Sequence, residues 1–332
     1  MVRGKLARST ALRLWSRRKG PALPLRIHSS ALRYFDAARR ARSIREAARQ
    51  LNVASSAVNR QIIKLEEEIG APLFDRLPSG LVLTPIGEAL ARHIITVFQD
   101  LDRTGSVIAD LQGTRAGHIT VAVVESVASS ILPNVIDQVR SRAPRVTFTI
   151  AVMGSFDIPD AVAKGEADVG VAFALRKSSD LHQVFLTQFR LGAVVKPDHP
   201  LARKKSVTLS SCLGFPLILA TPDLSITNLL EPILSNGPSF LSPVITCGSI
   251  ELMQELVSRG HGIAFQTRVG LERKLADGLL VHIPIEAKGP LWSDLGIYTR
   301  SGRLLPTTTD NFVQMLKTEI QSRQQAEGGR KA

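Results

Sequence analysis

The sequence predicts an α/β protein in which a small helical module, a long linker helix and a larger domain of strands and helices follow one another. Three observations predict it. Two short helical patterns are joined by a tight turn between Ser43 and Glu68, an apolar seven-residue repeat follows Pro85, and strand and helix patterns alternate from His118 onward. At 332 residues the chain is long enough for two or three domains with separate cores.

The two short helices have the features of a helix-turn-helix. The first begins at a capping box formed by Ser43 and Glu46 and ends at Asn52-Val53. The second begins near Ser55, and its apolar stripe consists of Val58, Ile62, Leu65 and Ile69. Its opposite face is polar. The pattern is typical of a helix that enters the major groove of DNA, although an αα-hairpin in an all-helical domain has the same periodicity.

The flanking sequences extend this module. Ser29-Ser30 can cap a first helix over 31–41, and Gly70 is a left-handed stop for the last helix. Turn residues at 78–80 separate two apolar runs and predict a short β-hairpin. A hairpin directly after a helix-turn-helix is a wing, and Arg76 at its base is placed to reach backbone phosphate or the minor groove.

Basic residues are concentrated around the module. The formal net charge is +13. Residues 1–28 contain eight Lys or Arg and no acid, residues 29–64 contain eight more against two acids, and the rest of the chain is close to neutral. A protein that is basic only around a helix-turn-helix has the electrostatic character of a polyanion binder, so we expect double-stranded DNA as a partner.

The first 28 residues are expected to form a basic, disordered tail, or to be an over-extended start ahead of a domain that begins near Ser30. Their composition is similar to that of an organelle transit peptide. They lack an apolar core followed by a small-residue cleavage site, which argues against secretion. No stretch approaches the ~20 apolar residues that span a bilayer. We therefore expect a cytoplasmic protein with no membrane association.

A long helix is predicted from Thr84-Pro85 to about Gly113, with threonine as its cap and proline in its first turn. Apolar residues recur along it at alternating offsets of four and three, interrupted only at Thr104: Leu90, Ile94, Val97, Leu101, Ile108 and Leu111. One such seam on one helix needs a partner. We expect a dimerising linker helix; packing against its own domain is the alternative.

From His118 the pattern changes to alternating strands and helices. Strands are predicted at 119–124, 146–152, 167–173, 191–196, 216–219, 244–247, 262–265 and 292–298. Helices are predicted at 126–142, 156–165, 225–235, 249–259, 267–276 and 307–323. This alternation predicts an α/β domain with a largely parallel sheet. A length of about 200 residues suits two small subdomains with a cleft between them.

The sequence contains no recognisable catalytic or metal-binding motif. GxGxxG, Walker A, HExxH and GxSxG patterns are absent, so we predict no enzymatic activity, no metal and no cofactor. The two cysteines, Cys212 and Cys247, have no CxxC spacing and no histidine at ligand distance. We expect reduced core thiols, and a redox-sensing pair is the alternative.

Four segments resemble the LysR-type transcriptional regulators: AVNRQIIKLEEEIGAPLFDR at 57–76, LVLTPIGEAL at 81–90, PDHPLA at 197–202 and LVSRGHGIA at 256–264. The resemblance covers the chain from Leu32 to about Ile320. It implies a sequence-specific DNA-binding regulator with a winged helix-turn-helix, a linker helix and a C-terminal two-lobed α/β domain that resembles type 2 periplasmic binding proteins. It also implies a small-molecule effector between the lobes and a homodimer or homotetramer, with RNA polymerase as a further candidate partner.

The domain organisation follows from these patterns. We expect a tail over 1–28, a winged helix-turn-helix over 29–84, a linker helix over 85–113, an effector-binding domain of two subdomains over 114–325 and a tail over 326–332.

The resemblance also implies roles for residues of the second helix. Where relatives often read Ser-Gln-Pro-Ala-Val-Ser-Arg-Gln, this chain has Ala-Ser-Ser-Ala-Val-Asn-Arg-Gln at 54–61. The residues expected to face DNA are Ser55, Ser56, Asn59, Arg60, Lys64 and Arg76. Asn59 replaces a serine, and because asparagine can bond adenine bidentately, base preference there is expected to differ. Arg60 and Arg76 are assigned to phosphate, which positions the protein without specifying sequence.

The expected effector site draws residues from both lobes. Ser126 lies at a strand-to-helix junction, where its hydroxyl and the following N–H groups suit a carboxylate. Ser155 occupies a second position that matches the family, and the other lobe is expected to contribute Ser225, Thr246 and Ser249. Each alone is more often a simple helix cap than a ligand contact. Phe173 stands where some relatives have a cation, so a monoanionic organic acid is favoured over a dianion.

Two other functions fit parts of the chain. A solute-binding protein of a transport system would consist of the C-terminal two-thirds with a signal peptide, and the N-terminal DNA module speaks against it. A nucleoid-type DNA binder would not need a ligand-sized α/β domain. The combination of both parts favours a regulator controlled by an effector.

Overall fold

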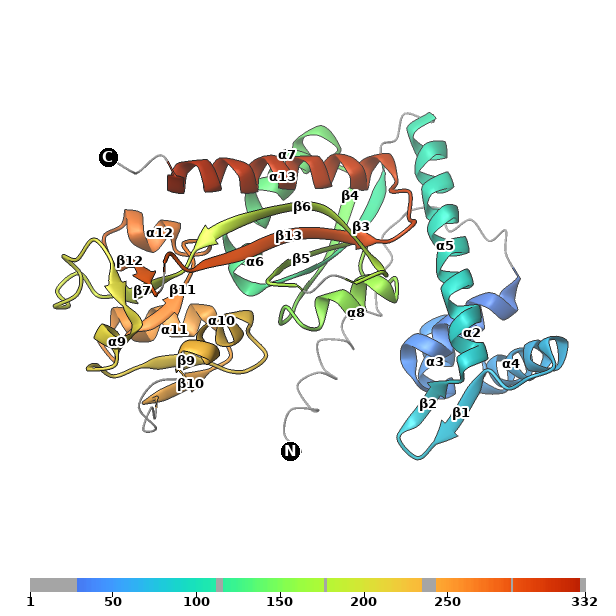
Figure 1. The fold of residues 1–332 in the computed structure, drawn as a ribbon. Coiled ribbons are helices and arrows are strands. Elements are labelled where there is room, and N and C mark those ends of the chain that lie inside the picture. The colour runs from blue at the N-terminus through green and yellow to red at the C-terminus, as the bar shows by residue number, and fades with distance from the viewer. Residues whose placement is uncertain (1–28, 112–115, 176–177, 235–242, 288, 329–332) are drawn as a thin grey trace. The chain divides into compact units, whose positions relative to one another are not determined.

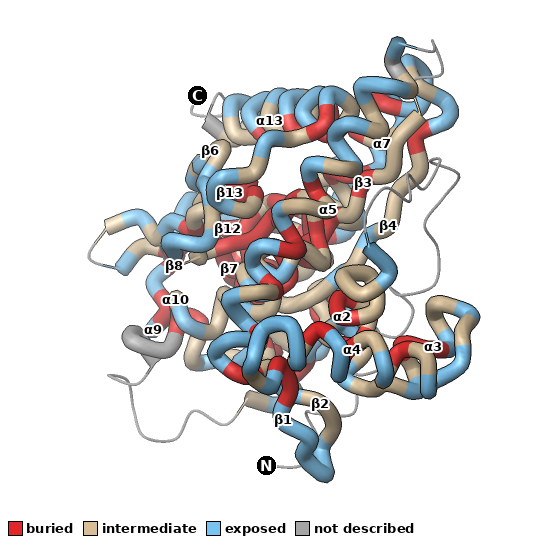
Figure 2. Tube along the Cα trace, turned by 90° about the vertical axis from the view of Figure 1, so that its right-hand side faces the viewer, coloured by how far each residue is buried: buried red, intermediate tan, exposed pale blue. Residues whose placement is uncertain are grey.

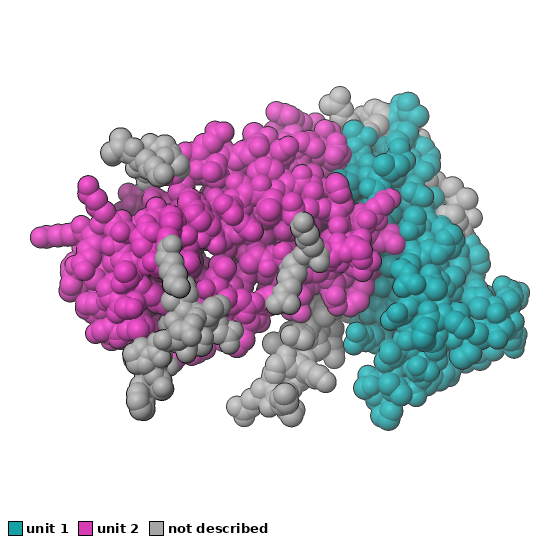
Figure 3. All heavy atoms as spheres, viewed as in Figure 1, with its two compact units in different colours: residues 1–118, 303–308 teal, residues 119–302, 309–332 magenta. Residues whose placement is uncertain are grey.

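The computed structural model describes residues 29–111, 116–175, 178–234, 243–287 and 289–328. The chain divides into two compact units (Figure 1, Figure 3): unit 1 comprises 1–118 and 303–308, and unit 2 comprises 119–302 and 309–332. The tail predicted over 1–28 lies outside the described residues.

Unit 1 begins with three helices, α2 (Ser30–Ala41), α3 (Ile44–Leu51) and α4 (Ser55–Ile69). The predicted caps are confirmed, because Ser29 Oγ accepts from the N–H of Ala31 and Ser43 Oγ accepts from that of Glu46. The core of this domain includes Phe35, Ala38, Ala47, Ala48, Val58, Ile62, Leu65, Leu73 and Ile94. Ile69, which the apolar stripe predicts to be buried, is 40% exposed because it is the last residue before the left-handed cap at Gly70.

The predicted wing is confirmed as an antiparallel hairpin of β1 (Phe74–Leu77) and β2 (Gly80–Leu83). Its start is bound to α4, since Glu66 Oε1 accepts from the N–H groups of Leu73 at 2.7 Å and Phe74 at 3.3 Å. Its return strand is bound to the end of α2, where Leu81 N donates to the carbonyl of Arg42. A Cβ at position 80 would lie 2.7 Å from that carbonyl oxygen, and φ there is +116°, so the position requires glycine.

Helix α5 (Pro85–Leu111) follows the wing, and Thr84 Oγ1 caps it by accepting from Gly87 N. The predicted apolar seam divides into two parts. Near its start, Ile94 is buried in the core of unit 1 and Leu90 packs against that core, so this part of the seam serves its own domain. Towards its end, Ile108 and Leu111 are 36% and 83% exposed.

Unit 2 has two lobes. Lobe I is a five-stranded sheet in the order β4-β3-β5-β13-β6. Its strands are β3 (Gly117–Val123), β4 (Val146–Val152), β5 (Val169–Phe173), β6 (Leu181–Arg190) and β13 (Trp292–Arg300). Its helices are α6 (Glu125–Ser130), α7 (Leu132–Arg142), α8 (Ile158–Ala163) and α13 (Thr307–Gly328). Helices α7 and α13 lie along one side of the sheet and α8 on the other (Figure 1).

Lobe II contains a four-stranded sheet in the order β11-β7-β12-β8 and a pair of strands, β9 and β10. The strands are β7 (Gly192–Val195), β8 (Val207–Thr208), β9 (Ile218–Ala220), β10 (Ile245–Cys247), β11 (Ala264–Gln266) and β12 (Val281–Glu286). The helices are α9 (Leu209–Cys212), α10 (Ser225–Leu234), α11 (Ile250–Ser258) and α12 (Glu272–Ala276). In Figure 2 the buried residues gather along strands such as β7 and β12, while the outer face of α13 is exposed.

The two lobes are joined by two crossing segments of chain. The chain enters lobe II at Leu191 and returns to lobe I before Trp292. The segments are bonded to each other, since Leu191 N donates to Leu291 O at 2.8 Å and Ile285 N donates to Leu191 O at 3.0 Å. This arrangement confirms the predicted two-lobed α/β architecture.

The predicted largely parallel sheet is wrong. Strand β3 is parallel to β5, but β13 is antiparallel to both β5 and β6, and β7 is antiparallel to β11 and β12. Strands β6 and β12 were not predicted. Most residues of β6 are exposed or half-buried, and β12 contains Pro284, which lowers its strand signal.

Several helix boundaries also differ from prediction. The helix predicted over 126–142 is two helices, because Pro133 in the first turn of α7 favours a new helix start after Ile131. Only 272–276 of the helix predicted over 267–276 is helical. Helix α13 continues to Gly328, so the tail predicted from 326 begins inside a helix, and 329–332 lie outside the described residues.

Candidate DNA-binding face and effector cavity

One face of α4 carries the polar residues that the sequence assigned to DNA. Ser55, Ser56, Arg60 and Lys64 are exposed, Asn59 is half-buried, and the opposite face of the helix is buried in the core. Their shared face follows from the 3.6-residue period of the helix. Unit 1 therefore presents hydroxyl, amide and cationic groups on one face of α4, which is the second helix of the helix-turn-helix. A helix that contacts base edges in the major groove needs such groups.

Arg76 is exposed on β1 and contacts this face directly. Its Nη2 donates to Asn59 Oδ1 at 3.0 Å, which joins the wing to α4. We call α4 the recognition helix, because it is the helix expected to enter the major groove. The sequence placed both residues near DNA but gave no reason to pair them. Whether Arg76 also reaches phosphate stays a prediction.

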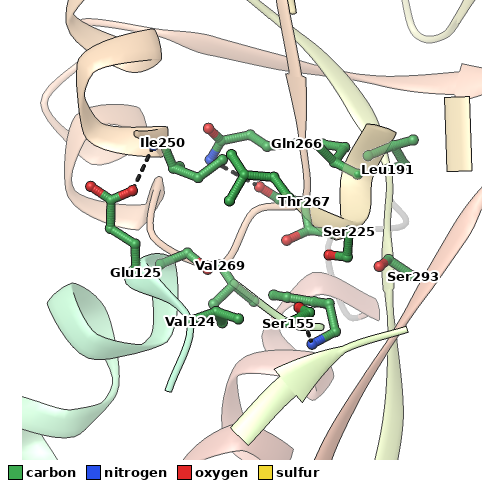
Figure 4. A pocket seen from close by; sticks show the side chains of 14 residues that line it. Val124, Glu125, Ser155, Leu191, Ser225, Ile250, Gln266, Thr267, Val269 and Ser293 are labelled. Atoms are coloured by element: carbon green, nitrogen blue, oxygen red, sulfur yellow. Dashed lines mark hydrogen bonds between the residues drawn. The ribbon is translucent and has the colours of Figure 1, made fainter. Parts of the chain in front are cut away.

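A cavity lies between the two lobes of unit 2 (Figure 4). It has about 520 Å³ of empty space, part of which is open to solvent, and its lining comes from both lobes and a crossing segment. The lining residues are Val124, Glu125, Ser126, Ser155, Phe173, Leu191, Leu224, Ser225, Ile226, Ile250, Gln266, Thr267, Val269 and Ser293. Most of its wall is apolar, with a few polar groups, which is the usual composition of a small-molecule site.

Three of the five predicted effector residues meet at this cavity: Ser126 and Ser155 from lobe I and Ser225 from lobe II. Ser155 is buried, and its Oγ accepts from the N–H of Phe173 at 3.3 Å. Within the described part of the chain, the hydroxyls of Ser126 and Ser225 have no protein partner, which leaves them available to a ligand. Among the described residues that line the cavity there is no lysine, arginine or histidine, and Phe173 is one of them.

The other two predicted residues are not at the cavity. Thr246 is exposed on β10. Ser249 is the cap of α11, where its Oγ accepts from Leu252 N at 3.2 Å. The helix-cap alternative that the sequence left open is therefore the observed role of Ser249, and we leave both residues out of the candidate site.

Glu125 connects the lobes at the edge of the cavity. Its carboxylate extends from α6 in lobe I to the start of α11 in lobe II, where it accepts from Ser249 Oγ at 2.8 Å and from Ile250 N at 2.6 Å (Figure 4). The negative charge lies at the N-terminus of α11, where the helix dipole and a free N–H favour it. We call this contact the Glu125 clasp. Sequence reasoning found no partner for Glu125, since the partner lies more than a hundred residues further along the chain.

Sequence reasoning also missed polar lining residues that follow or lie within strands. Gln266 ends β11, Thr267 follows it, and Ser293 lies in β13. The carbonyl of Gln266 is bonded to His282 Nε2 at 3.1 Å. Burial, and after it the charge of Arg268, lower the pKa of His282 to about 4. The ring is therefore neutral near pH 7. The position of Thr267 at a strand end was the signal that could have found it.

The cysteines have the burial that the sequence predicts for core thiols. Both are free and buried. Burial raises the pKa of Cys212 to about 11, whereas a reactive cysteine needs a lowered pKa. Among the described residues, no group of three or more side chains is arranged to hold a metal ion, and none of the helices is long and apolar enough to cross a membrane.

Two family models match the chain. The first, described as "Bacterial regulatory helix-turn-helix protein, lysR family", matches residues 29–88, and the second, "LysR substrate binding domain", matches residues 112–321. These ranges correspond to the helix-turn-helix with its wing and to the two-lobed domain with the cavity. The helix-turn-helix match excludes the interpretation of the chain as a solute-binding domain alone.

Curated relatives match the chain over most of their length. The chain is 26% identical over 262 residues to a probable RuBisCO transcriptional regulator of Cyanidioschyzon merolae, which covers 77% of this chain and 86% of that protein. It is 25% identical over 290 residues to the HTH-type transcriptional regulator CbbR of Rhodospirillum rubrum, with coverage of 87% and 96%.

Solved structures share the fold. A full-length OxyR variant of Pseudomonas aeruginosa has a TM-score of 0.68 at 19% identity, with 89% of this chain and 95% of that chain covered. Full-length BenM has a TM-score of 0.51 at 21% identity, with coverage of 89% and 97%. One conclusion follows from the family models over both parts of the chain, from the relatives that are transcriptional regulators, and from this fold. The chain belongs to the LysR family of transcriptional regulators, with a helix-turn-helix DNA-binding domain and an effector-binding domain.

Proposed function

We propose that this LysR-family regulator reads its operator with the exposed face of α4 and responds to a small organic acid held between the lobes of unit 2. The observation that carries the proposal is the cavity, because it combines residues of both lobes with unpaired hydroxyls. A ligand that touches both lobes favours one lobe arrangement over another, and this differential binding is what an effector needs in order to act.

On the DNA side, we assign base contacts to Ser55, Ser56 and Asn59 and phosphate contacts to Arg60 and Lys64. Their position on one helix face, where all but the half-buried Asn59 are exposed, supports this assignment. Purified full-length protein with Asn59→Ala is expected to lose discrimination between its selected site and random duplex, whereas Arg60→Ala is expected to weaken binding to both about equally. Fluorescence anisotropy on both duplexes measures the difference. Equal losses for both variants on both duplexes would contradict the assignment.

On the effector side, we assign Ser126, Ser155 and Ser225 to the ligand and a single negative charge to its polar end. Ser126 is the second residue of α6, so its hydroxyl and the neighbouring N–H groups can seat one carboxylate. A second carboxylate would find no cation among the lining residues, and the apolar wall suits a hydrocarbon body.

A ligand screen tests this assignment. Wild-type protein and Ser126→Ala are heated with monocarboxylates of increasing size, benzoate and shikimate among them, and with matched dicarboxylates such as phthalate. We expect some monocarboxylates to raise the melting temperature of the wild type, the dicarboxylates to have a smaller effect, and Ser126→Ala to lose about tenfold in affinity, roughly the worth of one charge-assisted hydrogen bond. Binding that Ser126→Ala leaves unchanged would remove Ser126 from the site.

We further infer a homodimer or homotetramer, with the exposed apolar end of α5 as one contact, because regulators of this family are oligomeric and this surface has no partner within the described part of unit 1. DNA and RNA polymerase are the macromolecular partners we propose, and the cytoplasm is the proposed location. We assign no catalytic activity, cofactor or metal to the chain.

A further inference from the structure

The wing and the recognition helix of unit 1 are held in a fixed relation by several bonds. Glu66 on α4 binds the backbone N–H groups of Leu73 and Phe74 at the start of the wing. Thr84 Oγ1, at the other end of the hairpin, donates to the carbonyl of Pro72 at 2.8 Å. These bonds fix the position of β1 relative to α4. A side chain on β1 can therefore contact only a defined part of the helix.

Asn59 lies on the side of α4 that faces the wing. It precedes Glu66 by seven residues, which is two helical turns, so the two side chains share one side of the helix. Arg76, two residues after Phe74 on β1, reaches it and donates from Nη2 to Asn59 Oδ1 at 3.0 Å. Asn59 thus lies between the wing and the exposed face that we assign to DNA.

The chemistry of the pair determines how the amide is turned. A guanidinium has only donors, whereas an asparagine amide has an oxygen that accepts and an NH2 group that donates. The amide must therefore present its oxygen to Arg76, and the NH2 group is left for another partner. A free asparagine can bond adenine with both of its ends, since Oδ1 accepts from N6 and Nδ2 donates to N7. The amide oxygen keeps a second lone pair, so the bond from Arg76 disfavours that pairing by turning Oδ1 towards the wing and not by using up its capacity to accept.

We propose that Arg76 sets the base specificity of Asn59, by turning its amide so that the NH2 group donates to guanine N7 and O6 in the major groove. Guanine presents two acceptors there, while adenine presents a donor at N6 that would meet the donors of the turned amide. Arg76 is then a positioning residue for base readout, in addition to any phosphate contact. The inference rests on the proposed DNA-contacting face of α4.

The test is selection from a random duplex library with full-length protein, followed by binding measurements on duplexes that differ at one base pair. Four proteins are compared: wild type, Arg76→Ala, Asn59→Ala and the double variant. Arg60→Ala is the matched control, since it removes an exposed arginine from the same surface without touching the amide. Arg76 is an exposed wing residue, so its truncation leaves the core of unit 1 intact.

We expect the wild type to prefer guanine over adenine at one position by roughly tenfold, the ratio that one base-specific hydrogen-bond pair supplies. Arg76→Ala should reduce this ratio to about one or invert it towards adenine, because the amide is free to turn. Asn59→Ala should lose the preference for guanine. The double variant should have the same guanine-to-adenine ratio as Asn59→Ala, since Arg76 acts on base choice through Asn59. Arg60→Ala should lower affinity for all duplexes and keep the ratio.

Two results would overturn the inference, and they are distinguishable. If Arg76→Ala binds every duplex more weakly but keeps the guanine-to-adenine ratio, Arg76 is a phosphate contact and the inference alone is wrong. If Asn59→Ala retains every base preference of the wild type, the assignment of Asn59 to a base contact in the proposed function is wrong and the inference falls with it.

Discussion

The DNA-binding face of unit 1 and the cavity of unit 2 are built in different ways. The residues assigned to DNA lie between Ser55 and Arg76, on one helix and the strand that follows the next turn. The cavity collects residues from Val124 to Ser293, and distant bonds keep its lobes together. One such bond, from Ile250 N to Glu125 Oε2, joins residues 125 positions apart.

The difference teaches how each site depends on its surroundings. The DNA-binding face needs only the small core of unit 1, so its structure should be lost and regained in one local unfolding and refolding step. The cavity depends on contacts between the lobes, and these contacts are not part of any one helix or hairpin. Small changes in them should therefore alter the balance between lobe arrangements before they unfold the domain. The following predictions separate these two behaviours.

The largest effect is expected from Phe35→Ala in unit 1. Phe35 is fully buried and its ring centroid lies 5.1 Å from that of Phe74 in the wing. Its loss should destabilise the DNA-binding domain by about 3–5 kcal/mol and abolish DNA binding. Hydrogen exchange should show faster exchange in α2 to α4 and unchanged protection in unit 2.

A matched substitution in unit 2 provides the control. Phe312 on α13 is also fully buried, and its ring centroid lies 5.6 Å from that of Phe148 on β4. Phe312→Ala should loosen lobe I and leave α2 to α4 protected. If either variant loses protection in both units together, the two units do not fold independently, and the comparison above is wrong.

Ile108→Glu tests the exposed apolar end of α5. Ile108 is 36% exposed near the apolar end of the helix, and a charge there should break a contact between two copies of the chain. Sedimentation should show a smaller species, and operator affinity should fall about hundredfold, or roughly 2.7 kcal/mol, because a single domain contacts one half-site. Ala89→Glu, at an exposed position elsewhere on α5, should leave the assembly unchanged. A dimer that survives Ile108→Glu would place the interface elsewhere.

The same contrast explains what sequence could predict. In unit 1, helix starts at Ser43 and Thr84, the stop at Gly70 and the wing were all readable, because caps and turns are decided by residues within a few positions of one another. In unit 2, Ser126 was found as a strand-to-helix junction, whereas Ser155 and Ser225 came from the resemblance to the family. Ser249 has the same local signal, but its hydroxyl caps α11, and no local pattern separates a cap from a ligand contact.

Features that depend on tertiary contacts were not readable. The Glu125 clasp joins α6 to α11, and the bond between Arg76 and Asn59 depends on how β1 runs beside α4. The direction of β13 between β5 and β6 likewise follows from the path of the whole chain. Long-range pairing leaves no mark on local periodicity, which is why the sheet was expected to be parallel.

The pH dependence of unit 2 is the next smaller effect. The pKa of His282 is lowered by burial to about 4, compared with about 6.5 in an unfolded chain. As pH falls below about 6.5, the unfolded state takes up a proton before the folded state does. The stability associated with the neutral ring is therefore full well above pH 6.5 and is lost progressively towards pH 4, with about 2 kcal/mol lost by pH 5.

Urea denaturation of wild type and His282→Gln between pH 7 and pH 4 measures this contribution. The variant should show a shallower fall in the free energy of unfolding, while its absolute stability at pH 7 is lower because Gly192 packs tightly against the ring. Equal slopes for the two proteins would mean that His282 titrates normally in the folded chain. The unfolding of unit 1 should have the same pH dependence in both proteins.

The smallest effect is expected from Glu125→Gln, and it addresses the link between the lobes directly. The variant replaces a carboxylate that accepts from Ser249 Oγ and Ile250 N with a neutral amide, and hydrogen bonds to charged groups are about twice as strong as neutral ones. The loss of about 1 kcal/mol should make the amide of Ile250 exchange about fivefold faster, since its only partner in the described structure belongs to the other lobe.

The amide of Leu252 is an internal control for this exchange measurement, because its acceptor Ser249 Oγ lies on the same helix end. Faster exchange at both amides would indicate fraying of α11, and no change at either would show that the Glu125 clasp does not hold the lobes together. Only a change confined to Ile250 supports a cleft whose closure depends on one long-range bond, in contrast to the locally held DNA-binding face.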